Sequence, residues 1–124
     1  VEIWNLVFTQ FNRTGYKQLE PLPSKNIDTG MGLERAAAVV QGVPTAFDID
    51  NMKKIVAASS ALLGKKYSAE DPESYRTRRI AEHARTVTFC IHEGVHPSNE
   101  KQGYVVRRLL RRAVLDAYQV GCRE

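Results

Sequence analysis

The chain has 124 residues, of which 43% are hydrophobic and 26% charged, as is ordinary for one soluble globular domain. No apolar run approaches the roughly 18 residues that a membrane-spanning helix needs, and the start Val1-Glu2-Ile3-Trp4 is neither an initiator methionine nor a basic signal segment. These features disfavour a disordered or membrane protein, and we expect the chain to be an excised piece of a longer one.

The net charge of +4 is unevenly distributed. Residues 1–75 carry 8 Lys and Arg against 9 Asp and Glu, whereas residues 76–124 carry 10 against 5. The basic excess in the second segment indicates a polyanionic partner. Cys90 and Cys122 are too few for a disulfide framework and lack a C-x-x-C spacing, which favours a reducing, cytoplasmic setting.

Strand signals come first. Residues 2–12 are rich in aromatic and branched side chains, which predicts a strand, with Gly15 in a turn and residues 16–20 as a candidate return strand. The prolines of Pro21-Leu22-Pro23 predict an extended, non-helical loop. Residues 26–28 then form a short strand that leads into a glycine-rich turn and a helix.

Helix signals follow. A helix is predicted over 33–41, and Asp48 or Asp50 can cap a second one over about 51–63. A last helix is predicted over 101–120. Each helix is expected to end before a glycine, and these glycines are Gly42, Gly64, Gly94 and Gly121.

The third helix is predicted to start at Asp71-Pro72, with proline in the first helical position. Beyond it, His92-Glu93-Gly94-Val95-His96 matches the zinc pattern H-E-x-x-H. Gly94 separates the histidines and Pro97 follows the second, so we expect no continuous helix and no zinc site. The apolar stripe of this helix has spacings of three and four residues and consists of Ile80, Ala84, Val87 and Ile91.

The eight residues from Asp28 to Arg35, Asp-Thr-Gly-Met-Gly-Leu-Glu-Arg, join the strand to the first helix. Gly30 and Gly32 lack the Cβ atoms that would hinder a close ligand or an unusual φ. The helix start offers N–H groups and a positive dipole end, and Arg35 adds a planar fork of donors for phosphate. Alone, the pattern favours a plain strand-to-helix turn with a surface arginine, and it matches neither the dinucleotide fingerprint nor a P-loop.

The last helix is predicted to have two unlike faces. At about 100° per residue, one arc is cationic and contains Arg107, Arg108, Arg111 and Arg112. The opposite arc is apolar and is expected to be buried; it contains Val106, Leu109, Leu110, Ala113 and Ala117. Asp116 is the only carboxylate within the helix, so phosphate contact is favoured over a solvated salt-bridge lattice, with some arginines serving neighbouring domains.

A turn precedes this helix, Pro97-Ser98-Asn99-Glu100. Ser98 or Asn99 can serve as a helix N-cap. The turn can also present an amide to a nucleic-acid groove. The two interpretations are compatible, and the spacing does not choose between them.

Several blocks, in order, resemble the alanyl-tRNA synthetases, a family of class II aminoacyl-tRNA synthetases. The blocks are Glu2-Ile3-Trp4-Asn5, Phe11-Asn12-Arg13, Glu20-Pro21-Leu22-Pro23, Ile27 to Arg35, Phe47-Asp48-Ile49-Asp50, Arg79-Ile80-Ala81-Glu82-His83, Gly94-Val95, Pro97-Ser98-Asn99-Glu100 and Gly103 to Arg112. The resemblance implies an α+β, mostly α, fold. Residues 1–44 would supply antiparallel strands and the motif 3 strand-turn-helix of the catalytic core, and residues 45–124 the start of a helical domain that recognises the tRNA acceptor stem.

The resemblance also implies an activity: joining alanine to ATP, with Mg²⁺, and transferring alanine to tRNA(Ala). Asp28 would hold the alanine ammonium and Arg35 the ATP phosphates, as the catalytic pair. The alanine pocket would contain Asn5, Val7, Asp28 and Gly30. The ATP side would contain Arg35, Gly32 and Glu2, with Glu2 as a magnesium or ribose contact.

On the RNA side, the resemblance implies that Asn99 lies near a G·U wobble pair of the acceptor stem, while Arg107, Arg108, Arg111 and Arg112 contact its backbone. Motifs 1 and 2 have no counterpart here, so the remaining core, the editing domain and the C-terminal domain would lie elsewhere in the same protein. The chain alone is expected to be inactive, with its first strands strained, swapped or paired with another copy. The alternative is a stand-alone RNA-binding helical module with a degenerate synthetase remnant; a zinc hydrolase is a remote third.

Overall fold

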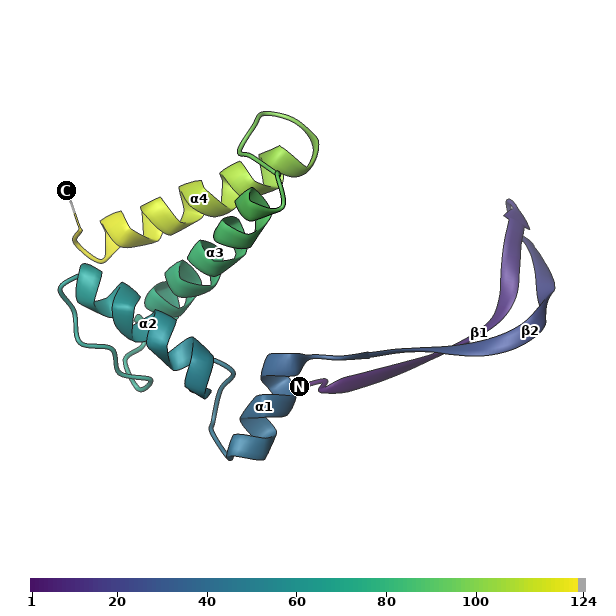
Figure 1. Cartoon of the computed structure of the whole chain (residues 1–124), viewed down its shortest axis with the longest axis horizontal. Coiled ribbons are helices and arrows are strands. Elements are labelled where there is room, and N and C mark those ends of the chain that lie inside the picture. The colour runs from purple at the N-terminus through teal and green to yellow at the C-terminus, as the bar shows by residue number, and fades with distance from the viewer. Residues whose placement is uncertain (123–124) are drawn as a thin grey trace. The chain divides into compact units, whose positions relative to one another are not determined.

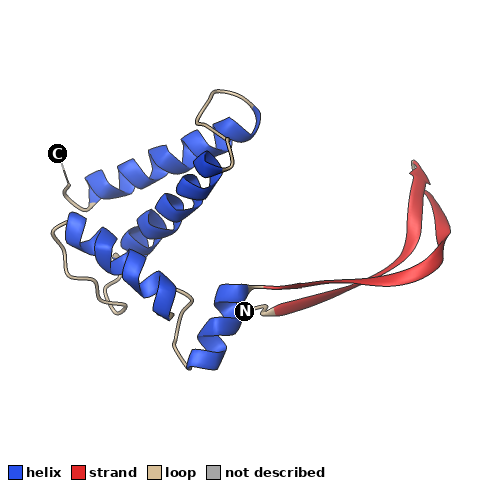
Figure 2. Cartoon of the chain, viewed as in Figure 1, coloured by secondary structure: helices blue, strands red, loops and turns tan. Residues whose placement is uncertain are grey.

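The structure is a computed structural model that describes residues 1–122. Its elements, in chain order, are β1 (Trp4–Gly15), β2 (Gln18–Met31), α1 (Leu33–Gln41), α2 (Asp50–Leu62), α3 (Ser74–His92) and α4 (Lys101–Gln119), as Figure 1 shows. They fall into two compact units, residues 1–46 and the residues from Phe47 onward. Both strands belong to the first unit (Figure 2), and the predicted α+β, mostly α, fold class is confirmed.

In the first unit, β1 and β2 form a long antiparallel ribbon that leads into α1 (Figure 1). Tyr16 and Lys17 make the hairpin turn, with Lys17 in the left-handed region at φ 58°. Gly15 is therefore the last residue of β1, and its predicted place in the turn was wrong. The Lys17 conformation is one that a two-residue hairpin turn commonly requires.

The predicted loop between two short strands is also wrong, because β2 runs continuously through both prolines. The ladder changes register there, between the Thr9–Asn26 pair and the Phe11–Pro21 pair. Proline lacks the N–H that a regular ladder uses, so a two-stranded ribbon accommodates it where pairing is irregular. The segment remains extended, as its prolines predict.

The predicted bounds of α1 are confirmed, and Gly42 ends the helix in the left-handed conformation at φ 63°. The other helix starts differ from the predictions. The N-cap of α2 is Ile49, without a side-chain cap bond, so the predicted aspartate cap was wrong. Asp50 is the first helical residue, and its Oδ1 accepts a 2.9 Å hydrogen bond from the Asn51 N–H.

The α3 helix begins later than predicted, at Ser74, and Pro72 lies in the turn before it. Asp71 organises that turn: its Oδ1 accepts from the Glu73 N–H and its carbonyl oxygen accepts from the Ser74 N–H, both at 2.9 Å. Both bonds belong to a turn that precedes the helix. The proline lies in this turn, so it does not occupy the first helical position.

The second unit is a layer of three helices in which α3 packs against both α2 and α4. Figure 1 shows α3 and α4 lying side by side. The buried apolar residues of this unit include Ile49, Met52, Val56, Ala81, Val87, Val106 and Val120. Small side chains on α3 allow its axis to lie close to the axes of α2 and α4.

The predicted apolar stripe of α3 was only partly correct. Val87 is buried and Ile80 half-buried, but Ala84 is exposed and Ile91 is 40% exposed. The buried positions of α3 are mostly small or polar, namely Ser74, Thr77, Ala81, His83 and Val87. Apolar spacing could not reveal a face built from serine and threonine.

The apolar arc of α4 shows a second departure. Val106 is buried and Leu109, Ala113 and Ala117 are half-buried, whereas Leu110 is exposed. Leu110 instead borders a surface hollow of about 410 Å³ with Arg111, Val114, Leu115 and Tyr118.

A buried ion cluster joins α3 to α4. The Asp116 side chain is only 1% exposed and accepts two hydrogen bonds from Arg79, from Nε at 2.6 Å and from Nη2 at 2.5 Å. Arg76 adds an ion pair at 3.2 Å and also donates to Gln119. Hydrogen bonding to Arg79 holds the pKa of Asp116 below its usual value, against the opposing effect of burial. The cluster fixes the orientation of α4 against α3, since a bidentate pair is directional.

Removing Asp116 is expected to destabilise the helical unit. In Asp116→Ala, the half-buried side chains of Arg76 and Arg79 lose this carboxylate. Removing one partner of a fully buried pair costs about 3–5 kcal/mol, and the partial exposure of both arginines reduces the expected loss to about 1–3 kcal/mol. Urea unfolding followed by far-UV circular dichroism measures it, with the exposed residue Glu70→Ala as the matched control. Equal stability of the two variants would contradict a stabilising role.

The same cluster predicts a pH dependence. Because the folded-state pKa of Asp116 is lowered, its stabilisation is present above about pH 4, the ordinary range of an aspartate. It is lost as the pH falls through the lowered pKa. An unfolding free energy that declines with acid in the wild type, but less steeply in Asp116→Ala, would support the assignment; parallel curves would contradict it.

Candidate functional site

Strand register places the four residues expected to line the alanine pocket on one face of the ribbon. Asn5 pairs with Gly30, and Val7 pairs with Asp28. Directly paired residues and residues two apart along a strand share a face. The residues are therefore neighbours, and all four are exposed. Asp28 forms no ion pair with any residue in the described part of the chain.

The opposite face of the ribbon is mostly apolar, and its side chains are exposed. Trp4 is 58% exposed and Phe8 is 64% exposed. The Trp4 indole N–H donates to the Thr29 hydroxyl, which links two residues of this face across the strands. The face contains Trp4, Leu6, Phe8, Ile27, Thr29 and Met31.

The glycine turn has a different geometry from the one predicted. Neither Gly30 nor Gly32 has a positive φ, and Gly32 is the extended N-cap of α1 at φ −73°. An added Cβ at Gly30 would meet no heavy atom within 4 Å, whereas one at Gly32 would lie 3.2 Å from the Arg35 Cδ. Glycine is therefore useful at position 32 because it leaves room for the Arg35 side chain.

Arg35 lies close to the start of β1. Its Nη1 donates a 2.7 Å hydrogen bond to the Glu2 carbonyl oxygen, and the Gly32 N–H donates to the Ile3 carbonyl at 3.1 Å. The structure thus brings together Glu2, Gly32 and Arg35, the three residues expected on the ATP side. The guanidinium is exposed at the N-terminal end of α1, where the helix dipole is positive.

The magnesium contact expected at Glu2 stays a prediction. Mg²⁺ prefers one or two carboxylates together with substrate phosphates and water. Among residues 1–122, no group of three or more His, Cys, Asp or Glu side chains is placed to hold a metal ion. Glu2 can supply one ligand at most, so these residues do not form a magnesium site by themselves.

The H-E-x-x-H match is not helical. The α3 helix ends at His92, and Gly94 adopts a left-handed conformation at φ 83°. The two histidines therefore do not lie one turn apart on a single helix, which the zinc pattern requires.

In the part of the chain that the structure describes, no helix has the length and apolarity needed to cross a bilayer.

The basic face of α4 is exposed along its length. Tyr104, Arg107, Arg108 and Arg111 line a hollow of about 200 Å³, and the Arg108 guanidinium lies 5.9 Å from the centre of the Tyr104 ring. Arg112 is exposed but lies outside this lining. Tyr104 was not predicted as a site residue, although its spacing of three, four and seven residues from these arginines could have indicated it.

Asn99 is held beside this face, because its side-chain oxygen accepts a hydrogen bond from Arg107 Nη1. Ser98 or Asn99 was predicted as the N-cap of α4, and this prediction was wrong. The N-cap is Glu100, which has no side-chain cap bond. The Ser98 hydroxyl instead closes the turn, donating to the Glu100 carbonyl at 2.9 Å. An added Cβ at Gly103 would lie 2.2 Å from this hydroxyl and 2.5 Å from the His96 carbonyl oxygen.

A family model described as tRNA synthetases class II (A) matches residues 1–124. The match covers the whole chain, and the chain therefore belongs to this family of class II tRNA synthetases.

Three relatives of this chain are named alanine–tRNA ligase. The protein from Rhodopirellula baltica is 59% identical over 100% of this chain and 13% of its own length. Those from Halalkalibacterium halodurans and Pediococcus pentosaceus are each 51% identical, over 98% and 100% of this chain. The chain spans about 14% of the length of the latter two. The resemblance to alanyl-tRNA synthetases inferred from the sequence blocks is confirmed.

Gly103→Ala is expected to displace the turn that carries Asn99. Its Cβ would meet the backbone oxygen of His96, which cannot rotate away as a side chain can. We expect a loss of about 1–3 kcal/mol in unfolding free energy, as for other overpacked sites. Urea unfolding measures it, with Gln102→Ala, an exposed neighbour, as the control. A variant as stable as the control would show that the turn yields easily.

Proposed function

We propose that this chain is part of an alanine–tRNA ligase, an enzyme that activates alanine with ATP and transfers it to tRNA(Ala) in the cytoplasm. The observation that carries the proposal is the single ribbon face with Asn5, Val7, Asp28 and Gly30, in a chain 51–59% identical to proteins named alanine–tRNA ligase. Residues 1–44 would complete a catalytic core, and residues 45–124 would begin the acceptor-stem recognition domain. The remaining core, editing and C-terminal domains would belong to the same protein.

The chemistry of the ribbon face suits a small amino acid. Asp28 is exposed, and its carboxylate can accept a charge-assisted hydrogen bond from an ammonium group. Gly30, directly opposite Asn5, contributes no side chain and leaves space for a methyl group.

Arg35 is proposed to bind the ATP phosphates. Its hydrogen bond to the Glu2 carbonyl orients the guanidinium before ATP arrives, and the start of α1 adds a positive potential. As pyrophosphate leaves, negative charge grows on the phosphate oxygens, and a fixed cation stabilises that charge. Orientation in advance matters because the protein then reorganises little during the reaction.

The basic face of α4 is proposed to contact the acceptor stem. Asp116, the helix's carboxylate, is engaged by Arg76 and Arg79, so it does not neutralise the face. Exposed arginines bind phosphates independently of sequence. Asn99, held by Arg107 at one end of this face, would supply the contact that distinguishes a G·U pair.

Activation of alanine tests the catalytic assignment. In the full-length protein that carries this chain, Arg35→Ala and Asp28→Ala are each expected to lower alanine-dependent ATP–pyrophosphate exchange by about 100-fold or more, as for lost transition-state contacts. Arg13→Ala and Glu20→Ala, exposed charges near the hairpin turn, are the matched controls.

Two results would count against these assignments. Full-length protein without alanine-dependent exchange, yet with intact RNA binding, would favour the stand-alone RNA-binding module. Exchange undiminished by the Arg35 and Asp28 variants would remove these residues from the site.

RNA recognition is tested separately by binding of acceptor-stem duplexes. Asn99→Ala is expected to weaken discrimination between a G·U stem and its G·C counterpart by about 1–3 kcal/mol. Arg108→Ala and Arg111→Ala are expected to weaken both stems alike and to reduce the salt slope by about 1 each. Lys54→Ala, on the exposed side of α2, is the control. Equal loss for both stems in Asn99→Ala would contradict its assigned role.

A further inference from the structure

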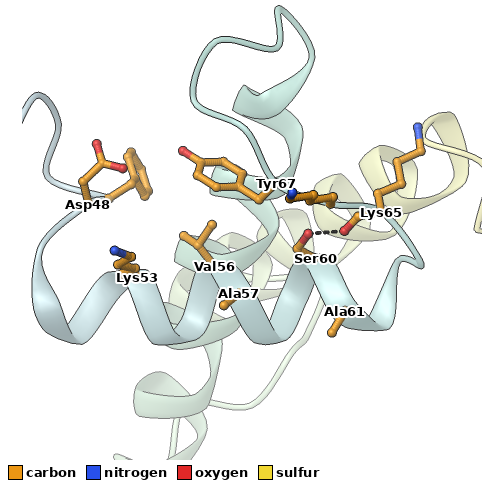
Figure 3. Close-up of a pocket in the computed structure, with 10 residues that line it drawn as sticks. Asp48, Lys53, Val56, Ala57, Ser60, Ala61, Lys65 and Tyr67 are labelled. Carbon is orange, nitrogen blue, oxygen red and sulfur yellow. Dashed lines mark hydrogen bonds between the residues drawn. The ribbon is translucent and has the colours of Figure 1, made fainter.

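The helical unit contains a further hollow, on α2, that the proposed alanine, ATP and stem contacts do not use. Its volume is about 350 Å³, within the range of small-ligand sites. The loop after α2 closes one side, and the segment before α2 closes another (Figure 3). Its apolar lining consists of Phe47, Val56, Ala57 and Ala61.

A tyrosine hydroxyl in this hollow lacks a partner. Tyr67 Oη is buried and has no hydrogen bond to any residue among those described. Figure 3 shows the Tyr67 ring lying over α2 above Val56, with its hydroxyl toward the end that carries Asp48 and Lys53. Burial raises the pKa of this hydroxyl. A buried polar group without a partner is costly, which makes a ligand acceptor here favourable.

The charges around the hollow favour an anion. Three lysines line it, Lys53, Lys65 and Lys66, against one carboxylate, Asp48. Lys53 lies at one end and Lys65 at the other (Figure 3). A nucleotide within a strand has a phosphate on either side of its sugar, whereas a free nucleotide has phosphate on one side only. Cations at both ends of an aromatic-lined slot therefore match a strand better than a free nucleotide.

We propose that this hollow binds one unpaired nucleotide of RNA, with the base against Phe47 and Tyr67 and the flanking phosphates near the lysines. The choice of RNA as the source rests on the proposed tRNA-binding function. Base stacking on aromatic rings tolerates any base, so this contact would add affinity without adding sequence preference.

The test measures binding of the full-length protein to two RNA duplexes, one with a single-stranded 3′ extension and one blunt. Lys53→Ala and Ala57→Leu are the test variants, because the first removes a cation and the second fills the hollow from an exposed helix position. Each is expected to weaken binding of the extended duplex by about tenfold and to leave the blunt duplex unchanged.

Matched controls lie one residue further along α2. Lys54→Ala and Ala58→Leu alter exposed side chains that do not line the hollow, and both are expected to bind like the wild type. Thermal unfolding checks that Ala57→Leu folds. Lys53→Ala changes an exposed side chain and keeps the test decisive if Ala57→Leu does not fold.

Titration with free AMP forms the second arm. Binding of AMP that Ala57→Leu abolishes, without any effect on the extended duplex, would overturn RNA as the occupant and leave a free nucleotide in its place. Equal effects of test and control variants on both ligands would overturn the site altogether. Wild-type alanine-dependent exchange reports on the ligase proposal independently of either result.

Discussion

The antiparallel register of β1 and β2 is the constraint on which the chemistry of the first unit depends. Because Asn5 pairs with Gly30 and Val7 with Asp28, one face carries every residue of the proposed alanine pocket, and the other carries the apolar side chains. A shift of one residue in one strand would turn half of these groups to the other face. The same register brings the start of β1 to α1, where Glu2 and Gly32 position Arg35.

The packing and the surface charge of the second unit both depend on the position of the one carboxylate of α4. Asp116 is buried and engaged by Arg76 and Arg79 of α3, so the ion cluster both holds the two helices together and leaves the outer arginines without an acidic partner on their own helix. Structure and electrostatics are thus coupled: the residue that fixes the rotation of α4 also maintains the positive potential of its exposed face. The hydrogen bond from Arg107 then ties Asn99 to that face.

Local chemistry made much of the fold predictable. Glycine ends helices because it adopts the left-handed conformation cheaply, and Gly42, Gly64, Gly94 and Gly121 all have positive φ. The features that were not predicted depend on residues far away in the sequence or in other elements. The partners of Asp116 lie 37 and 40 residues away, and the buried face of α3 is partly serine and threonine, which apolar spacing does not detect. The roles of Gly32 and Gly103 likewise depend on the close approach of Arg35 and Ser98, which only coordinates reveal.

The most direct test of the central claim is a crystal structure of the full-length protein with a non-hydrolysable alanyl-adenylate analogue. We expect the alanine ammonium within hydrogen-bonding distance of the Asp28 carboxylate, its methyl group over Gly30, and Arg35 oriented toward the nucleotide from the start of α1. An analogue bound entirely by residues outside this chain, with the Asn5–Asp28 face open to solvent, would contradict it.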